Sequence, residues 1–276
     1  MTLQFTKMHG LGNDFIVIDG VRQAIHLTPA DIRRLSPRET GIGFDQCLLV
    51  EPSSEPGVDF FYRIFNANGE PVGQCGNGAR CIARFIQHYG LSTSRTLSVA
   101  TNTTRLSLQL NTDDTVTVNM GQPQLDPALI PMHASLQAVT YSISLGEDIT
   151  TDVHALSIGN PHAILIVDNL ATAPVSRLGK IVCEHPLFPE QTNVGFLKLD
   201  TPNHIHLRVY ERGCGETQAC GSGAVAAAAV GRLYYQLDER IRVSVPGGDL
   251  WVDWADIKGP IFLTGPATFV YEGHLL

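Results

Sequence analysis

Two cysteines stand at the start of segments that predict helices, each within a glycine-rich motif. Cys75 begins C-G-N-G-A, and Cys220 begins C-G-S-G-A. The positive end of a helix lowers the pKa of a thiol, so we expect both cysteines to exchange protons near neutral pH. The glycines let the backbone approach a ligand closely and leave N–H groups free to bind an anion such as a carboxylate. These residues therefore predict acid–base chemistry beside a carboxylate.

Two thiols that flank one carbon from opposite faces would invert its configuration. One thiolate would remove a proton from the α-carbon, and the opposite thiol would return a proton to the other face. Helix dipoles and N–H donors on the adjacent carboxylate can stabilise the carbanion in a dry site. We therefore expect no cofactor, and the sequence offers no obvious place for pyridoxal phosphate.

The other four cysteines favour structural roles, because a buried cysteine usually packs as a small hydrophobic residue. They are Cys47, Cys81, Cys183 and Cys214. A zinc site would need closely spaced ligands, whereas Cys75/Cys81 and Cys214/Cys220 are each separated by five residues. No metal site is predicted.

An internal duplication relates the two motifs. G-N-D-F-I-V-I-D at Asn13 matches G-N-P-H-A-I-L-I-V-D at Asn160, an offset of 147 residues, and Gln46 lies opposite Asn193 at the same offset. Cys75 and Cys220 are 145 residues apart. The two offsets are nearly equal, so the two halves differ by few insertions. We therefore expect one arrangement of strand, loop, cysteine and helix to occur twice.

The elements that must position these residues are mostly short strands. Alternating apolar runs predict strands at residues 15–19, 46–50, 59–65, 96–100, 105–110, 115–120, 141–145, 204–210, 241–245, 249–254, 260–264 and 268–272. Helices are predicted from Thr28-Pro29, after Cys75 as far as Gly90, at residues 174–182 and after Cys220.

The helix after Cys220 contains A-V-A-A-A-A-V and is apolar on every side, which indicates a helix that a sheet surrounds. The predicted fold class is therefore α+β, with two domains related by a pseudo-twofold. Each is a curved, mostly antiparallel sheet or barrel wrapped around a central helix. We expect residues 1–120 to form the N-terminal half, joined by the last strand at 267–276, and residues 121–266 to form the C-terminal half, because a proline-rich link follows Gly121.

Composition excludes several functions. The 276 residues carry a net charge of −8, so no basic surface is expected to bind nucleic acid or an anionic membrane, and a small polar partner is favoured. The apolar runs are too short to cross a bilayer. The first residues do not resemble a secretory signal, and we expect a cytoplasmic protein whose thiols stay reduced.

Polar residues near the repeats are candidates for binding. Four asparagines lie at predicted strand ends, where turn formation is the alternative role: Asn13, Asn66, Asn160 and Asn193. His162 lies within a repeat element, although most histidines are structural. Glu211 and Arg212 could form a solvated ion pair, yet beside the Cys220 loop they match the ammonium and carboxylate groups of an amino acid.

At these residues the chain resembles the diaminopimelate epimerase family. The similarity spans the whole chain and rests on the motifs K-M-H-G-L-G-N-D-F at Lys7, F-D-Q at Phe44, C-G-N-G-A-R-C at Cys75, G-N-P-H at Gly159 and E-R-G-C-G-E-T-Q-A-C-G-S-G-A at Glu211. The resemblance implies a pyridoxal-independent isomerase of lysine and cell-wall precursor synthesis that interconverts LL- and meso-2,6-diaminopimelate. Members of this family are typically cytoplasmic and often homodimeric, so the resemblance implies a cytoplasmic homodimer here.

The resemblance assigns roles residue by residue. It implies that Cys75 and Cys220 are the acid–base pair, and that Glu211 takes the amino group. It implies that the reacting carboxylate is held by Gly76, Asn77, Gly221 and Ser222. The remaining substrate contacts, chiefly at the distal, non-reacting end, would come from Asn13, Gln46, Asn66, Asn160, Asn193 and Arg212.

Two alternatives stay open. A related cofactor-free isomerase of the proline racemase kind would use the same two thiols on another amino acid, although the polar distal residues suit a second amino-acid head better. The cysteines could instead form a thiol redox switch without isomerase activity.

Overall fold

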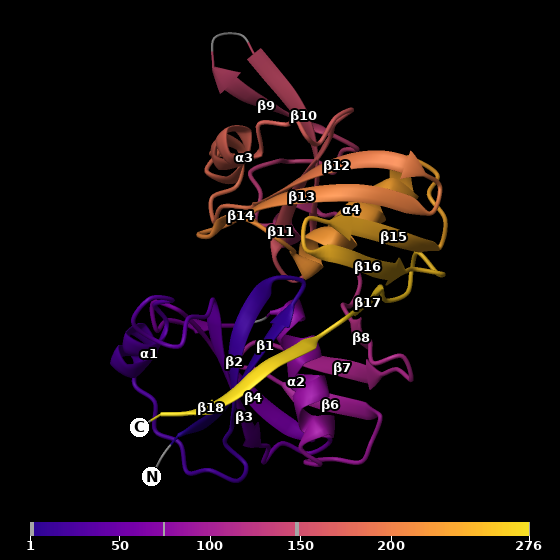
Figure 1. Ribbon diagram of the computed structural model, residues 1–276. Coiled ribbons are helices and arrows are strands. Elements are labelled where there is room, and N and C mark those ends of the chain that lie inside the picture. The colour runs from indigo at the N-terminus through magenta and orange to yellow at the C-terminus, as the bar shows by residue number, and fades with distance from the viewer. Residues whose placement is uncertain (1–2, 74, 147–148, 276) are drawn as a thin grey trace. The chain divides into compact units, whose positions relative to one another are not determined.

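The computed structural model describes residues 3–73, 75–146 and 149–275 (Figure 1). The chain forms two compact units. Unit 1 consists of Met1–Asn119 and Gly265–Leu276, and unit 2 consists of Met120–Thr264. The C-terminal segment therefore returns to the unit in which the chain begins.

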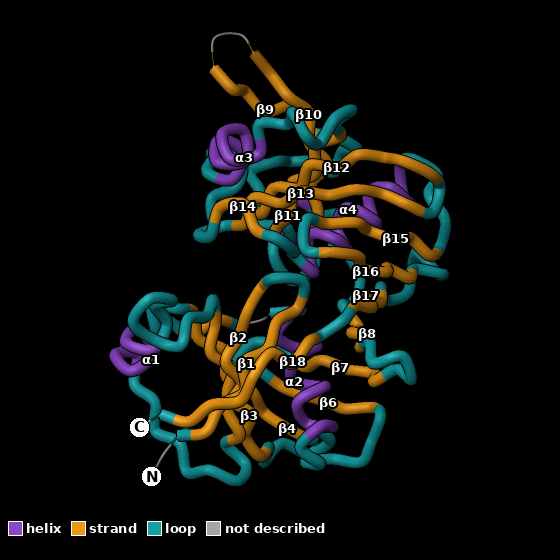
Figure 2. The backbone as a smooth tube through the Cα atoms, in the orientation of Figure 1, coloured by secondary structure: helices purple, strands orange, loops and turns teal. Residues whose placement is uncertain are grey.

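Unit 1 is a curved sheet around the helix that follows Cys75. That helix is α2 (Gly76–His88), and it packs against β1, β2, β3, β7 and β8, so strands surround it (Figure 2). The strands of this unit are β1 (Gln4–Gly10), β2 (Asn13–Asp19), β3 (Gln46–Pro52), β4 (Phe60–Asn66), β5 (Pro71–Val72), β6 (Thr96–Ala100), β7 (Arg105–Leu110), β8 (Val116–Asn119) and β18 (Thr268–His274). A short helix, α1 (Pro29–Leu35), begins after Thr28 with a capping box.

Unit 2 repeats this plan around α4 (Gly221–Tyr234). The helix packs against β10, β11, β12, β13, β15 and β16, and its residues from Gly223 to Gly231 are buried on every side. The strands are β9 (Tyr141–Gly146), β10 (Ile149–Ser157), β11 (Pro161–Ile166), β12 (Asn193–Thr201), β13 (His204–Glu211), β14 (Gly215–Thr217), β15 (Arg240–Val245), β16 (Gly248–Asp253) and β17 (Phe262–Gly265). A 3-10 turn, η1 (Pro127–Leu129), precedes them.

The duplication extends to strand register. In unit 1, β2 and β3 are parallel with Phe15 opposite Gln46, and in unit 2, β11 and β12 are parallel with His162 opposite Asn193. Both partners differ by the offset of 147 residues found in the sequence. Each unit otherwise consists mostly of antiparallel pairs. The predicted fold class, two mostly antiparallel sheets each wrapped around a helix, is confirmed.

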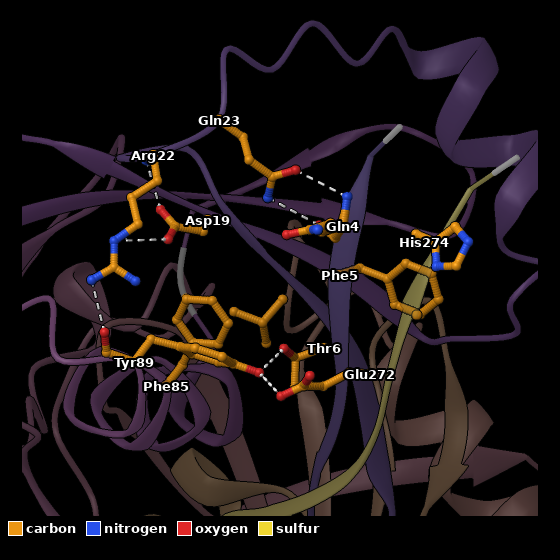
Figure 3. Close-up of a pocket in the computed structure, with 12 residues that line it drawn as sticks. Gln4, Phe5, Thr6, Asp19, Arg22, Gln23, Phe85, Tyr89, Glu272 and His274 are labelled. Atoms are coloured by element: carbon orange, nitrogen blue, oxygen red, sulfur yellow. Dashed lines mark hydrogen bonds and ion pairs between the residues drawn. The ribbon is translucent and has the colours of Figure 1, made fainter. Parts of the chain in front are cut away.

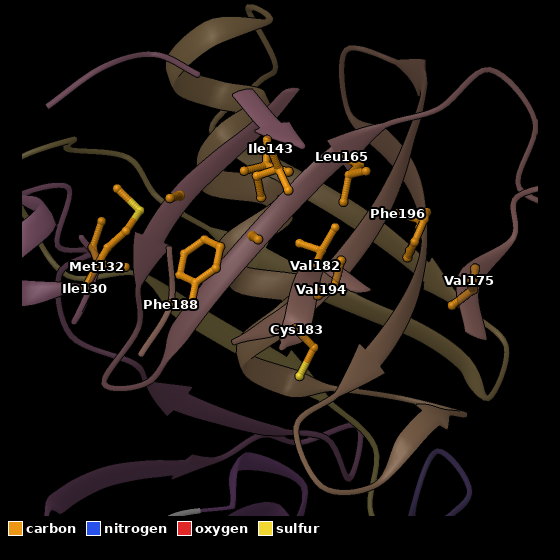
Figure 4. Close-up of a cluster of buried hydrophobic side chains, with 13 residues drawn as sticks. Ile130, Met132, Ile143, Leu165, Val175, Val182, Cys183, Phe188, Val194 and Phe196 are labelled. Carbon is orange, nitrogen blue, oxygen red and sulfur yellow. The ribbon is translucent and has the colours of Figure 1, made fainter. Parts of the chain in front are cut away.

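A second helix covers the outside of the sheet in unit 2. This is α3 (Val175–Cys183), which contacts β12, β13 and β14. Its buried side chains join an apolar cluster with the turn before β9 and the strands of the sheet, as Figure 4 shows for Val182, Val194 and Phe196. At Gly179 an added Cβ would lie 2.5 Å from the Cβ of Tyr210, so only glycine lets α3 approach β13 this closely.

Several strands lie outside the predicted set. They are β1, β5, β10, β11, β12 and β14. The alternating pattern was absent from β1 because Thr6 and Lys7 are buried polar residues in a strand that pairs on both sides. In β12 the first five residues are all buried, and such a continuous run lacks the period of two. No helix in the described ranges is long and apolar enough to span a membrane.

Candidate active site

Cys75 is the N-cap of α2. Its backbone is extended, and its sulfur accepts a hydrogen bond from the Gly78 N–H at 3.3 Å. The sulfur thus takes the place that a serine or aspartate oxygen usually fills at a helix start. The side chain is half-buried, and the thiol lies 3.9 Å from Oδ1 of Asn13.

A chain of amides continues from Cys75. Nδ2 of Asn77 donates to Oδ1 of Asn13 at 3.2 Å, and Nδ2 of Asn13 donates to Oδ2 of Asp45 at 2.9 Å. Asn13, singled out by the duplication, and Asn77, implied by the family resemblance, are therefore hydrogen-bonded to one another beside the cysteine. Gly76 is the first residue of the helix beside them.

Charged residues that the sequence analysis missed hold this loop. Asp14 and Asp45 each accept a hydrogen bond from the other's backbone N–H, and Arg38 bridges both carboxylates at 2.7–2.9 Å. Burial favours the neutral acid at Asp14, but hydrogen bonds from Arg38 and Lys7 outweigh it and hold the pKa of that carboxyl well below its usual value. Long-range pairs of this kind leave no periodic pattern in a sequence.

Gln46 and Asn66 lie opposite one another on β3 and β4. Nε2 of Gln46 donates to Oδ1 of Asn66 at 2.9 Å. The other amide atom, Oε1 of Gln46, is buried and has no hydrogen-bond partner in the described part of the chain. A buried acceptor without a partner is the kind of group that a ligand's N–H completes.

Cys220 begins α4 in the same way. Its sulfur accepts from the Gly223 N–H at 3.4 Å and lies 3.6 Å from the Ser222 hydroxyl. Burial raises the pKa of this thiol well above its ordinary value, and the Glu211 carboxylate adds to the rise, although hydrogen bonds from Ser222 and Gly223 oppose it. The prediction that the helix start would lower the pKa is therefore wrong for Cys220, because full burial outweighs the helix dipole.

Asn160 and His162 lie beside this helix start. Nδ2 of Asn160 donates to the Ser222 hydroxyl at 3.4 Å, and Oδ1 of Asn160 is 3.2 Å from Nε2 of His162. His162 is fully buried, which lowers its pKa to about 3, and the nearby charge of Arg212 acts in the same direction. Its Nδ1 has no hydrogen-bond partner among the described residues. His162 is therefore a neutral imidazole near pH 7.

The end of β13 supplies the remaining predicted residues. The Thr217 hydroxyl donates to a Glu211 carboxylate oxygen at 2.5 Å. The backbone N–H of Arg212 donates to Oδ1 of Asn193 at 2.9 Å, and its guanidinium donates to the carbonyl of Glu190 at 2.8 Å. Unit 1 thus brings Asn13 and Asn77 to Cys75, and unit 2 brings Ser222 and Glu211 to Cys220.

Comparison with known proteins agrees with this geometry. The family model described as diaminopimelate epimerase matches residues 5–125 and 154–270. The diaminopimelate epimerases of Legionella pneumophila strains Paris and Corby are each 59% identical to the chain over 276 residues, which cover 100% of both proteins.

The chain belongs to the diaminopimelate epimerase family. Solved structures with a similar fold have far lower identity. A hydroxyproline epimerase from Agrobacterium vitis has a TM-score of 0.69 at 15% identity and covers 99% of this chain and 92% of its own. A probable proline racemase from Agrobacterium radiobacter K84 has a TM-score of 0.70 at 16% identity, covering 99% and 93%. These similarities concern the fold alone.

Three of the four remaining cysteines are buried in this member of the family. Burial raises the pKa of Cys47 and of Cys81 to about 12, and it also raises that of Cys183. These thiols stay protonated at neutral pH. Cys214, which was expected to be structural as well, is exposed in the turn between β13 and β14.

One group among the described residues has the composition of a metal site. Asp200 near the end of β12 and His204 and His206 at the start of β13 have potential ligand atoms within 4.8 Å of one another. Nδ1 of His204 already lies 3.0 Å from a guanidinium nitrogen of Arg242, and its Nε2 lies 2.9 Å from the Ser244 hydroxyl. The cation beside these side chains is therefore the chain's own arginine.

A cavity of about 330 Å³ in unit 1 lies away from the cysteine (Figure 3). It borders Phe85 and Tyr89 at the C-terminal end of α2, whereas Cys75 is at the N-terminal end, about 20 Å away for a helix of this length. In Figure 3 the Tyr89 hydroxyl points toward Thr6 and Glu272. None of the predicted site residues borders this cavity, so we do not place the substrate there.

Proposed function

We propose that the chain interconverts LL- and meso-2,6-diaminopimelate by a two-cysteine acid–base mechanism. The observation that carries this proposal is that Cys75 and Cys220 occupy matching helix starts, one in each unit, in a member of the diaminopimelate epimerase family. The reaction belongs to the synthesis of lysine and of peptidoglycan precursors. It needs no pyridoxal phosphate in this mechanism.

The reacting carboxylate binds at the two helix starts. Backbone N–H groups at the first turns of α2 and α4 suit an anion, and the helix dipoles favour negative charge there. Gly76 and Asn77 supply one set of donors, and Gly221 and Ser222 supply the other. The same donors stabilise the negative charge that moves onto the carboxylate when the α-carbon loses its proton.

Cys75 and Cys220 act on opposite faces of the α-carbon. In one direction the Cys75 thiolate removes the α-proton, and the electron pair of the broken C–H bond is delocalised into the carboxylate. The Cys220 thiol then donates its proton to the other face, which leaves a Cys220 thiolate and an inverted carbon. The burial of Cys220 and the charge of Glu211 support the assignment of the resting proton to Cys220.

The two amino-acid ends of the substrate bind different groups. Glu211 accepts hydrogen bonds from the ammonium group at the reacting centre. The distal ammonium and carboxylate are bound by Arg212, Asn13, Gln46, Asn66, Asn160 and Asn193, and neutral His162 acts as a hydrogen-bonding group beside Asn160. This set of polar side chains suits a second amino-acid head, which proline lacks.

We further infer a cytoplasmic homodimer. The cytoplasmic location is inferred from membership of the diaminopimelate epimerase family. Val270 and Tyr271 on β18 are 54% and 45% exposed and offer an apolar surface to a second copy. Sedimentation velocity measures the mass in solution, and a monomer at micromolar concentration would overturn the dimer.

Deuterium exchange tests the reaction. Reduced protein without pyridoxal phosphate is incubated with LL-diaminopimelate in deuterated water, and deuterium at the α-carbon and formation of the meso isomer are followed. Exchange with inversion at one centre is the expected result. Exchange with proline in place of diaminopimelate would overturn the substrate, and exchange with neither amino acid would overturn the isomerase.

A further inference from the structure

Arg80 is a fully buried cation in the second turn of α2. Its relative exposure is 0%, and it lies five residues after Cys75. A buried charge costs several kcal/mol unless hydrogen bonds and an opposite charge compensate it. The location of Arg80 beneath a catalytic helix start therefore requires an explanation.

In the described part of the chain, the hydrogen-bond acceptors of Arg80 are all neutral. Nη2 donates to Oδ1 of Asn77 at 2.8 Å, Nε donates to the carbonyl of Pro266 at 3.2 Å, and Nη1 donates to the carbonyl of Gly76 at 3.4 Å. Within the described ranges no carboxylate forms an ion pair with this guanidinium. The start of α2 and the turn before β18 thus meet at one charge.

Gly10 makes room for the guanidinium. A Cβ at this position, the last residue of β1, would lie 3.2 Å from Nη2 of Arg80 and 3.2 Å from Cβ of Asn77. This glycine belongs to the motif K-M-H-G-L-G-N-D-F. The motif therefore supplies both the space for Arg80 and the amide of Asn13.

Arg80 determines which way the Asn77 amide faces. A guanidinium can only donate, so the atom of Asn77 that faces it must be the oxygen. Nδ2 of Asn77 then faces Asn13 and donates to its Oδ1, the same atom that lies 3.9 Å from the Cys75 sulfur. The orientation of two amides beside the thiol follows from one buried donor.

The titratable groups near Arg80 leave one candidate for its counter-charge. The thiols of Cys81 and Cys75 are the groups whose ionisation would favour the charged arginine. Burial raises the pKa of Cys81 to about 12, so that thiol remains neutral. Tyr62 on β4 is the other buried group that interacts with Cys75, and burial raises its pKa far above the neutral range. The thiolate of Cys75 is the anion that remains.

We propose that Arg80 is a positioning residue that stabilises the Cys75 thiolate by its charge and orients Asn77 and Asn13 beside it, with the Asn13 oxygen placed to accept from the thiol whenever Cys75 is protonated. The proposal rests on the proposed function of Cys75 as a base. Arg80 does not touch the substrate in this arrangement. Its charge acts on the thiol from within the unit, so its effect is measurable without any substrate.

The experiment measures the ionisation of Cys75 in Arg80→Gln, Arg80→Lys and wild-type protein. Iodoacetamide alkylation is followed from pH 5 to 10, and the peptide that contains Cys75 is quantified by mass spectrometry, which separates it from exposed Cys214. Arg84→Gln is the matched control, because Arg84 lies one turn further along α2 and pairs with Asp114. Circular dichroism confirms that each variant is folded.

We expect Arg80→Gln to raise the midpoint of Cys75 alkylation by about one pH unit or more, which is the shift typical of losing a nearby opposite charge. Arg80→Lys keeps the charge without the fork of donors, so it should restore much of the midpoint while kcat for the epimerisation stays at least about tenfold reduced and KM changes less. The control should match wild type in both measurements.

An unchanged midpoint in folded Arg80→Gln would overturn the proposal. If Arg80→Gln does not fold, Arg80→Lys decides, because a wild-type kcat in that variant would also overturn it. If the wild-type protein has no isomerase activity, the proposed function is wrong. The alkylation midpoint of Cys75 would still test the effect of Arg80 on that thiol, because it is measured without substrate.

Discussion

Glu211 acts on the charge of Cys220. The thiol is fully buried at the start of α4, and the carboxylate at the end of β13 adds a negative charge that disfavours the thiolate. The Glu211 carboxylate is itself held by the Thr217 hydroxyl at 2.5 Å. The Cys220 thiol is therefore kept protonated by its surroundings, as its proposed role as the general acid requires.

Glu211→Gln should lower the pKa of Cys220, because it removes the negative charge and leaves the hydrogen bonds from Ser222 and Gly223 in place. We expect the alkylation midpoint of Cys220 to fall by about one pH unit, a usual size for one nearby charge. Mass spectrometry of the Cys220 peptide across pH measures it. Glu216→Gln is the control, because Glu216 lies on neighbouring β14 and pairs with Arg208. An equal fall in both variants would contradict a specific effect of Glu211.

Cys75→Ala and Cys220→Ala should each reduce epimerisation by about 10³-fold or more, because each removes an acid–base group that acts on one face. Cys183→Ala should stay within about threefold of wild type, and its loss of a buried sulfur should cost about 1 kcal/mol of stability. Coupled assays of the meso isomer measure the rates. Similar activity in all three variants would exclude the two-cysteine mechanism.

A second readout separates chemistry from misfolding in these variants. Cys75→Ser or Cys220→Ser should still eliminate halide from a halogenated substrate analogue, because elimination needs only one proton removal. Loss of elimination in both serine variants would indicate that the site had not formed.

The sequence was enough to predict the helix starts, the central helices and the repeated strand ends, because interactions between residues close in the chain determine them. The helix starts at Cys75 and Cys220 were predicted from the glycine-rich motifs, and the structure places both cysteines there. The helix after Cys75 was predicted from its apolar face and its closing glycine, and the helix after Cys220 from a run of residues that is apolar on every side. The duplication predicted that Asn13 and Asn160 occupy matching strand ends, and the shared register of β2–β3 and β11–β12 agrees with it.

The remainder depends on distant pairs and on burial. The reciprocal bonds of Asp14 and Asp45 connect strand ends 31 residues apart. The pKa of Cys220 was predicted in the wrong direction because the dipole of a helix is visible in the sequence, whereas the degree of burial is not. Strand β1 was not predicted for the same reason. Its buried residues Thr6 and Lys7 are polar, and a polar run in a sequence is typical of a loop.

His162 should make stability depend on pH in the acid range. Its pKa is about 3 in the folded chain against 6.5 ordinarily, so the unfolded chain binds a proton that the folded chain does not over that interval. The free energy of unfolding should therefore fall as pH falls below about 6.5, by up to about 1.4 kcal/mol per pH unit for this one group. His162→Gln should remove that contribution. Urea unfolding at pH 7 and pH 5 compares the two, with exposed His26→Gln as the control; an unchanged pH dependence in His162→Gln would refute it.

Cys47 should produce the opposite dependence in the alkaline range. Burial raises its pKa to about 12 in the folded chain, while the unfolded thiol ionises near its ordinary value of 9.0. Above that value the unfolded state loses a proton that the folded state keeps, so stability falls as pH rises, by up to about 1.4 kcal/mol per pH unit.

Cys47→Val fills a similar volume in β3 and removes the thiol, so its free energy of unfolding should decline less than that of wild type between pH 8.5 and pH 10. Denaturant unfolding at both pH values measures the difference, and Cys214→Ser, at an exposed turn, serves as the control. Parallel curves for Cys47→Val and wild type would mean that ionisation of Cys47 does not contribute to alkaline unfolding.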